Sequence, residues 1–271
     1  MIIKKQYFTP DRLIEMAKNI QMIDKCIEYD RIISISEIGW VYPMSILPIA
    51  VYANNNDVIL YYSGDNLDID SYLCTICFPD GVTSLSDINS NYIPITKISC
   101  GLENPMLNDY EERILSNVSE KYRSSFINGL KFLTSELQNN VEEHADIGHY
   151  WIFAQYWEKT KTCEICIVDT GIGYKESYKG TKYEVDNHFD AIKNALNGLS
   201  CKPIKERGCG VSGIMRMFIE GYKGELMIMS GNGLLYVNKK KPTMYKCPVS
   251  WNGAIIGLKF TLKNIDVSKY Y

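Results

Sequence analysis

The sequence lacks the features of a membrane or exported protein. No apolar run reaches the roughly 18 residues that suggest a spanning helix, and the N-terminus MIIKKQYFTPDRL has basic residues without the apolar stretch of a secretory signal. Basic residues are not in excess, since 29 Lys and Arg stand against 32 Asp and Glu, a formal net charge of −3. Nucleic-acid binders usually need a basic surface. These absences favour a cytoplasmic protein with neither a membrane nor a nucleic acid as its partner.

Cysteine is too sparse for a disulfide framework. Nine cysteines, an odd number, are spread over 271 residues, which fits reduced thiols in a reducing compartment. Two Cys-x-x-Cys pairs, Cys74/Cys77 and Cys163/Cys166, raise the alternative of a zinc site. The second pair lies in the alternating run TCEICIVD, where residues three apart point to opposite faces of a strand. The first lies in a short predicted helix, so we interpret all four cysteines as structural.

The order of helical and strand patterns divides the chain into two predicted domains. Residues 1–105 alternate between helices and strands, which predicts a small α/β domain. Residues 106–271 have long helical stretches followed by alternating apolar runs, which predicts helices packed on one face of a mainly antiparallel sheet, an α+β sandwich. Helices are expected near 8–30, 42–57, 68–81, 107–122, 124–145, 187–198 and 207–221, and strands near 31–36, 58–63, 149–158, 163–169, 224–231, 233–238 and 253–262.

One predicted helix carries polar residues at helical spacing. In SELQNNVEEHA, Glu136 and Asn140 are four residues apart and share a face, and His144 lies another four residues on. This face can offer a carboxylate base and an amide oxygen to one bound object. Taken alone, the pattern is more typical of an exposed helix surface.

The next strand ends in a glycine turn, DTGIG. Asp169 is its first residue, and Gly171 and Gly173 follow. A tight turn explains Asp followed by Gly without any function. In a binding site, Asp169 would accept a hydrogen bond from an exocyclic amine, and the glycines would let a planar base approach the backbone.

A third glycine-rich stretch, RGCGVSG, opens an apolar helix. Backbone N–H groups at such a helix start can bind phosphate. The spacing of Gly208, Gly210 and Gly213 matches G-x-G-x-x-G, yet the preceding SCKPIKE is no strand and the acidic residue expected about 20 residues on is missing. We therefore reject a Rossmann dinucleotide site.

The order of these three stretches, over about residues 125–262, resembles the nucleotide-binding domain of the GHKL superfamily. Gyrase-type ATPases, histidine kinases and anti-sigma-factor kinases share this domain. The sequence of the stretches ELQNNVEEHA…GHYWIFAQY…ICIVDTGIGYKES is most similar to ATP-binding proteins near the anti-sigma-factor kinases. The resemblance implies a Bergerat-type sandwich that holds ATP between helices and sheet.

The resemblance also implies roles for the predicted helix 124–145. Asn140 would coordinate Mg²⁺ through its side-chain oxygen, and the ion would bridge the phosphates. Glu136 would orient and deprotonate the attacking water or acceptor hydroxyl. His144 would have an orienting, structural role at the edge of the cofactor site.

In the remaining two stretches, the resemblance implies contacts to adenine and phosphate. Asp169 would accept the adenine amine, with Gly171 and Gly173 shaping the pocket. The phosphates would be held at the start of the last helix by Gly208, Gly210, Val211 and Gly213, with Arg207 or Lys205 reaching one of them.

The chain departs from the family in two places. Residues 174–207 would form a mobile lid, but this lid is short and has few basic residues, which weakens the expected capture of the terminal phosphate. Where the family often has Gly-Thr before the last strand, this chain has Gly253 and Ala254. A hydroxyl contact near adenine is therefore expected to be missing.

The first hundred residues have a fainter resemblance, to a STAS-type domain, over about residues 10–95. It rests on the order strand, turn, helix, strand in DRIISISEIGWVYPMSILPIAVYANNNDVILYYS. Regulated STAS domains start this helix with a phosphorylated serine, and Met44 occupies that place here, with Ser45 beside it. We expect a scaffold or dimerisation role, and a plain α/β cap is the alternative.

The function that these patterns predict is a GHKL-type ATPase with ATP and Mg²⁺ as cofactors, acting as a nucleotide-dependent signalling switch with slow hydrolysis. Its expected partner is another protein or a second copy of the chain. Two alternatives stay open: a serine/threonine protein kinase of the anti-sigma type, and a module that senses ATP without turning it over. A histidine kinase is disfavoured, because the three histidines, His144, His149 and His188, all lie outside a phosphoacceptor hairpin.

Overall fold

The computed structural model describes most of the chain in both predicted domains. The described residues are 10–28, 31–35, 41–61, 67–82, 92–100, 118–144, 148–199, 210–238 and 241–270. The helix predicted near 107–122 lies largely outside them. No helix in the described part is long and apolar enough to cross a bilayer.

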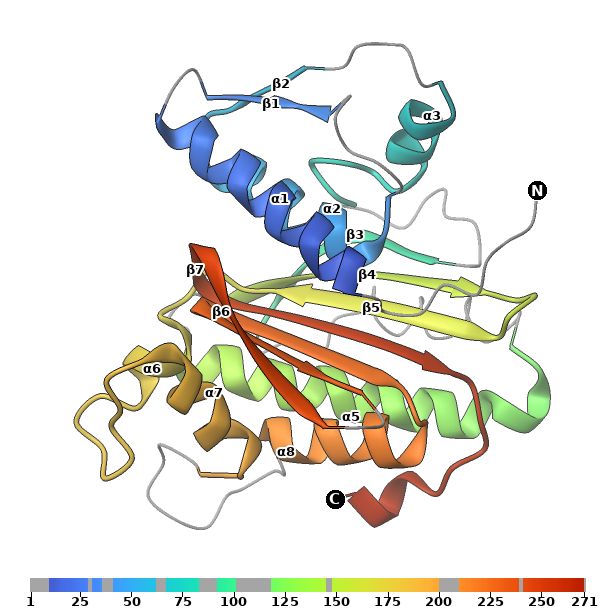
Figure 1. Cartoon of the computed structure of the whole chain (residues 1–271). Helices are drawn as coiled ribbons and strands as arrows, with labels where there is room; N and C mark the ends of the chain where they lie inside the picture. Colours follow the sequence, from blue (N-terminus) through green and yellow to red (C-terminus); the bar gives the residue numbers. More distant parts are fainter. Residues whose placement is uncertain are drawn as a thin grey trace.

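A five-stranded sheet forms the centre of the molecule, in the order β3-β4-β5-β7-β6 (Figure 1). Its strands are β3 (Tyr92–Ser99), β4 (His149–Trp157), β5 (Thr162–Val168), β6 (Glu225–Val237) and β7 (Pro242–Thr261). Every neighbouring pair is antiparallel. The predicted α+β class with an antiparallel sheet is confirmed. Strand β3 belongs to the predicted first domain but pairs with β4, while the division at residue 105 stays a prediction.

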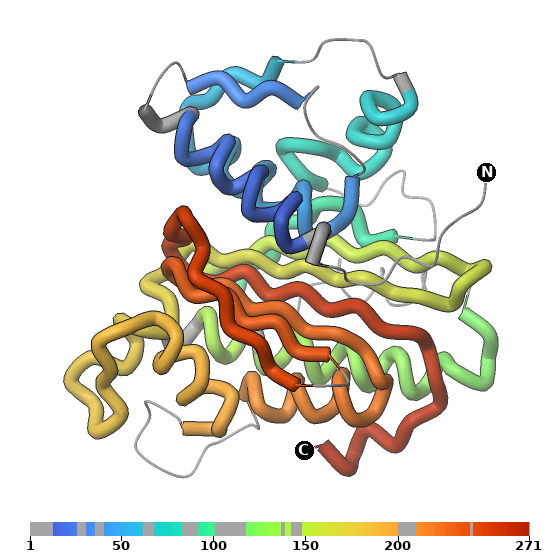
Figure 2. Tube along the Cα trace, viewed as in Figure 1, coloured from blue at the N-terminus to red at the C-terminus, as the bar shows by residue number. Residues whose placement is uncertain are grey.

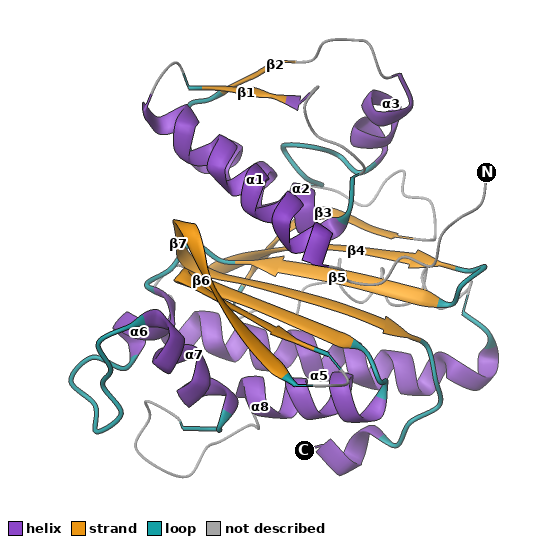
Figure 3. Ribbon diagram, viewed as in Figure 1, coloured by secondary structure: helices purple, strands orange, loops and turns teal. Residues whose placement is uncertain are grey.

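Helices cover both faces of this sheet (Figure 3). On one face lie α5 (Glu120–His144), α7 (His188–Leu196) and α8 (Gly210–Met215), and α8 continues as a π-helical segment, Arg216–Gly221. On the other face lie α1 (Pro10–Glu28) and α2 (Pro43–Asn55). Beyond them stand the short parallel pair β1 (Ile32–Ser34) and β2 (Ile59–Tyr61), and α3 (Leu67–Thr75). The chain trace in Figure 2 places its C-terminal end beside α8.

Alternation along the strands explains how one sheet serves two cores. In β4, Tyr150 and Ile152 join the cluster under α5, whereas Trp151 and Phe153 join the cluster under α1 and α2. The same holds in β5, where Cys163 and Cys166 are buried in different clusters. Strand residues point alternately to the two faces. The prediction that Cys163 and Cys166 face apart is therefore confirmed.

The two helical layers are held by apolar stripes at helical spacing. On α5 the stripe includes Phe126, Leu130, Leu133 and Val141, each at most 4% exposed. On the other face, Met44 of α2 packs directly on Gly257 of β7, where any Cβ atom would collide with the methionine side chain. The missing side chain of Gly257 therefore allows α2 to sit close to the sheet.

Several element boundaries differ from the predictions. Strands expected at 224–231 and 233–238 form the single strand β6, because Gly231, at φ +55°, lets the chain pass through an irregularity in its pairing with β7. Strand β7 begins at Pro242, well before the predicted start at residue 253. A short helix that was not predicted, α6 (Gly173–Ser177), follows the DTGIG turn.

Candidate functional site

The first two of the candidate residues lie toward the C-terminal end of α5. Glu136 is 8% exposed, although its neighbours on the helix include exposed positions. Its Oε2 atom accepts a hydrogen bond from the backbone N–H of Gly210, at 2.6 Å. Glu136 and Gly210 are 74 residues apart in sequence. The interpretation of Glu136 as part of an exposed helix surface is therefore wrong, and the fold joins the first glycine of α8 to α5.

Asn140 lies one turn further along α5. Its side-chain nitrogen Nδ2 is buried and has no hydrogen-bond partner among the described residues. Leaving a buried amide group unpaired costs about 1–3 kcal/mol. This amide nitrogen therefore still has hydrogen-bonding capacity that a polar ligand could use. His144 is the last residue of α5, and its side chain lies outside the description.

The carboxyl group of Asp169 lies at the end of β5, where the chain leaves the sheet. Burial raises the pKa of this carboxyl to about 6, even though hydrogen bonds from backbone N–H groups of Gly171 and Ala254 act to lower it. The Gly171 N–H donates to Oδ1 at 3.0 Å. The side chain is thus oriented by the glycine turn, and its carboxyl titrates nearer to neutral pH than an ordinary aspartate while remaining mostly ionised at pH 7.

Two glycines at and beside the Asp169 turn lie where a side chain would collide with its neighbours. Gly173 has φ +73°, and a Cβ on it would lie 2.7 Å from Ser230 Oγ. Gly253 has φ +91°, and a Cβ on it would lie 2.5 Å from Asp169 Oδ1. Both conformations are in the left-handed region that glycine adopts at least cost.

Hydrogen bonds tie the Asp169 turn, residues 169–173, to the sheet. The Trp251 indole N–H donates to the carbonyl oxygen of Asp169 at 2.9 Å, and the Asp169 N–H donates to the Ala254 carbonyl at 2.9 Å. Ser230 and Trp251 were not among the predicted site residues. A single serine in the apolar run ELMIMSG was the available signal for Ser230, which is 1% exposed.

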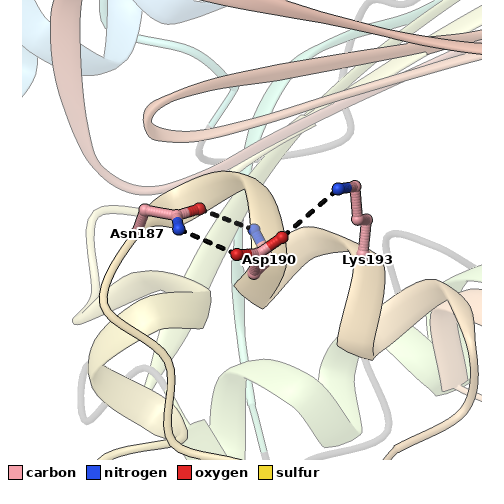
Figure 4. Close-up of polar contacts among 3 residues, drawn as sticks. All are labelled: Asn187, Asp190 and Lys193. Atoms are coloured by element: carbon pink, nitrogen blue, oxygen red, sulfur yellow. Dashed lines mark hydrogen bonds and ion pairs between the residues drawn. The ribbon is translucent and has the colours of Figure 1, made fainter.

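The predicted lid begins as an ordered pair of short helices. Helix α7 starts at the cap residue Asn187, whose Oδ1 accepts the Asp190 N–H at 2.9 Å. Figure 4 shows Asp190 between Asn187 and Lys193, with contacts of 2.8 Å and 3.2 Å. These contacts lower the pKa of the Asp190 carboxyl, and the hydrogen bond from Asn187 contributes most.

Helix α7 is also packed against the sheet. The imidazole of His188 lies over Gly231 in β6, where a Cβ would collide with the ring. Burial lowers the pKa of His188, and Lys175 of α6 lowers it further. Of the predicted lid, the structure describes residues 174–199. This part is held against the sheet through α7.

The remaining phosphate-site candidates are divided between described and undescribed residues. Gly210 opens α8, and Val211 and Gly213 are buried in its first turns. Arg207, Gly208 and Lys205 lie outside the described residues. The fold thus joins Glu136 to Gly210, and joins Asp169 to Gly171, Gly173 and the corner of β7 at Gly253. Asn140 lies four residues beyond Glu136 on the same helix.

The structural interpretation of the two Cys-x-x-Cys pairs stays a prediction. Among the residues that the structure describes, no group of three or more His, Cys, Asp or Glu side chains could hold a metal ion. Asparagine is not one of these four residue types, and the magnesium role of Asn140 stays a prediction.

Comparisons of the chain with protein-family models, with curated proteins and with solved structures found no match.

Proposed function

We propose that this chain binds ATP with Mg²⁺ at the end of the sheet where α5, the Asp169 turn and the start of α8 meet. The bound nucleotide would set a conformational or partner-binding state, accompanied by slow hydrolysis or phosphoryl transfer. The observation that carries the proposal is the 2.6 Å hydrogen bond between Glu136 and Gly210, which joins two of the three sequence stretches across 74 residues.

The residues present suit a magnesium–phosphate group. Asn140 has a buried amide group with no partner for its nitrogen among the described residues, and amide oxygens are among the ligands that magnesium accepts. When bound, Mg²⁺ would neutralise charge that develops on the phosphates. Asn140 would hold the ion through its side-chain oxygen.

Glu136 would act as the base. Its hydrogen bond to Gly210 fixes Oε2, so the other carboxylate oxygen is the one that would accept a proton from water or an acceptor hydroxyl. A fixed carboxylate contributes chiefly by positioning, because phosphoryl transfer depends on orientation and charge neutralisation more than on covalent chemistry.

Asp169 would recognise the base. Its carboxylate would accept a hydrogen bond from the exocyclic amine of adenine, and Gly171 and Gly173 would leave room for the ring. A pKa of about 6 means that the carboxyl is mostly ionised near pH 7 and ready to accept.

A sensor that never turns ATP over is the second candidate. The same hydrogen bond favours it, because one oxygen of the carboxylate already joins α5 to α8, a structural role that requires no chemistry. Nucleotide binding would then change the contact between α5 and α8 without chemistry.

The test is a steady-state ATPase assay on wild type and Glu136→Ala, with Glu120→Ala as control, an exposed glutamate at the start of the same helix. An ATPase loses most of its turnover in Glu136→Ala and keeps it in Glu120→Ala. Equal inactivity in wild type and Glu136→Ala, with ATP bound by both, supports the sensor. Labelled γ-phosphate appearing on a partner protein would instead identify a kinase.

A further inference from the structure

The side chain of Ser230 lies between the two segments that enclose Asp169. It is a buried hydroxyl on β6, 1% exposed, at the point where the pairing of β6 with β7 becomes irregular. Its cross-strand partner on β7 is Ala254. The resemblance led us to expect a threonine hydroxyl at the position of Ala254. Ser230 supplies a hydroxyl directly across from that position, on β6.

Both bonds of this hydroxyl go to the walls of the candidate base site. Ser230 Oγ accepts the backbone N–H of Tyr174 at 3.1 Å, directly after the Asp169 turn. The same hydroxyl donates to the carbonyl oxygen of Gly253 at 2.8 Å. One side chain therefore links the end of the Asp169 turn to the corner of β7.

The link leaves little freedom for the two glycines. A methyl group on Gly173 would lie 2.7 Å from Ser230 Oγ and 2.9 Å from the Gly253 carbonyl oxygen. Gly253 in turn lies close to Asp169, because a Cβ on it would lie 2.5 Å from Oδ1. A shift at Ser230 would therefore be passed through Gly173 and Gly253 to the Asp169 carboxylate.

We propose that Ser230 is a positioning residue that sets base selectivity by holding the Asp169 turn against β7. This inference rests on the proposed function. Its hydrogen bonds are both made to protein backbone, so it acts through Asp169 and does not need to touch the nucleotide. Geometric positioning of a few tenths of an ångström is what separates a strong hydrogen bond to an amine from a weak one.

Inosine triphosphate provides the matched probe, because it differs from ATP by a carbonyl oxygen in place of the exocyclic amine. A site built to pair with that amine rejects the analogue that lacks it. Loosening the Asp169 turn should therefore weaken ATP binding while changing the binding of inosine triphosphate little. A purely structural role for Ser230 would weaken both nucleotides equally or neither.

The experiment is calorimetric titration of wild type, Ser230→Ala and Ser230→Cys with each triphosphate and Mg²⁺. Ser230→Cys is close in size and keeps only weak hydrogen bonding, so it tests the idea even when the alanine variant does not fold. Ser250→Ala, at an exposed serine on β7, is the control. We expect the ratio of the two affinities to fall about tenfold in both Ser230 variants, which corresponds to about 1.4 kcal/mol, and to stay unchanged in the control.

An unchanged ratio in a folded Ser230 variant overturns this inference and leaves ATP binding intact. Absence of ATP binding by the wild-type protein overturns the proposed function, and the role of Ser230 with it.

Discussion

The two faces of the five-stranded sheet are covered by helices that treat buried polar groups differently. On the α1/α2 face, the Asn19 side chain donates to the Ser45 carbonyl at 3.1 Å, and the Ser45 hydroxyl is bonded to the backbone of Tyr42. On the α5/α8 face, the Asn140 amide nitrogen has no partner among the described residues. The buried amide of the α1/α2 face is thus paired within the protein and that of the α5 face is not, although Trp151 Nε1 under α1 and α2 also has no partner among the described residues.

The start of α2, in the N-terminal half, is buried. Met44, at the place where a STAS domain carries its phosphorylated serine, is 5% exposed and packs on Gly257. The neighbouring Ser45 is also 5% exposed, and its hydroxyl caps the start of α2 through Tyr42. In this conformation neither position offers a hydroxyl to a kinase. The α1/α2 layer therefore supports the sheet, and its relation to STAS domains stays a prediction.

The largest expected effect belongs to Met44→Ala on the α1/α2 face. Its side chain fills the space left by Gly257, so truncation leaves a cavity that the glycine cannot fill. We expect the free energy of unfolding to fall by about 2–5 kcal/mol, measured by urea denaturation. The folded protein should keep its ATP affinity. A loss of ATP affinity as large as the loss of stability would show that the two faces are not independent.

Ile14→Ala provides the matched control for that experiment. Ile14 lies on α1 and is 52% exposed. Exposed substitutions usually change stability by less than about 0.5 kcal/mol, so this variant should unfold at nearly the wild-type urea concentration.

A smaller effect is expected for Asn140→Ala on the α5 face, and it concerns ATP affinity and not stability. Removing a polar contact to a charged group costs about 1.5–3 kcal/mol, so the magnesium-dependent part of ATP affinity should fall about 10- to 100-fold. Stability should change little. The neighbouring Asn139, which is exposed, gives the control Asn139→Ala. Equal affinities in the two variants, measured by calorimetry, would remove Asn140 from the site.

The smallest predicted effect is the pH dependence that Asp169 imposes on ATP binding. The carboxyl has a pKa of about 6 in the free protein because of burial, and only its ionised form accepts the amine. At pH 5 about one molecule in ten is competent, so ATP affinity should be roughly tenfold lower than at pH 7. Asp169→Asn should bind more weakly with no such step at pH 6. A wild-type affinity that is flat from pH 5 to 7 contradicts this role.

The same carboxyl also makes the folding stability depend on pH. Stability falls as the pH rises, whereas ATP affinity rises. Its folded pKa is raised from 3.8 to about 6, so the neutral form is favoured in the folded state. The resulting stability is present below pH 4 and is lost as the pH rises through 6. Without nucleotide, thermal stability of the wild type should fall over this window relative to Asp169→Asn.

The sequence predicted those parts of the fold in which local pattern and packing agree. Helix α5 and strands β4 and β5 follow from clear periodicity and lie near the expected residues. Strand β7 starts earlier than expected because its first half, PTMYKCPVSW, contains Pro248 and polar residues that weaken the strand pattern. Helix α6 was missed because five residues are too few to show a helical period.

The candidate site was predictable as three separate stretches and not as one object. Helical spacing places Glu136 and Asn140 on α5, but no local rule predicts that Glu136 meets Gly210 across 74 residues. That contact depends on how α5 and α8 pack on the sheet. Ser230 was missed for the same reason, because its two partners, Tyr174 and Gly253, are distant in sequence.

The central claim is that a purine triphosphate binds where α5, the Asp169 turn and the start of α8 meet. Calorimetric titration of the wild-type protein with a non-hydrolysable ATP analogue, in the presence and absence of Mg²⁺, tests it most directly. We predict one binding site per chain, with affinity increased by magnesium and weakened in Asp169→Asn. Absence of binding heat with ATP, ADP and the analogue, at protein concentrations where the fold is intact, would contradict the account.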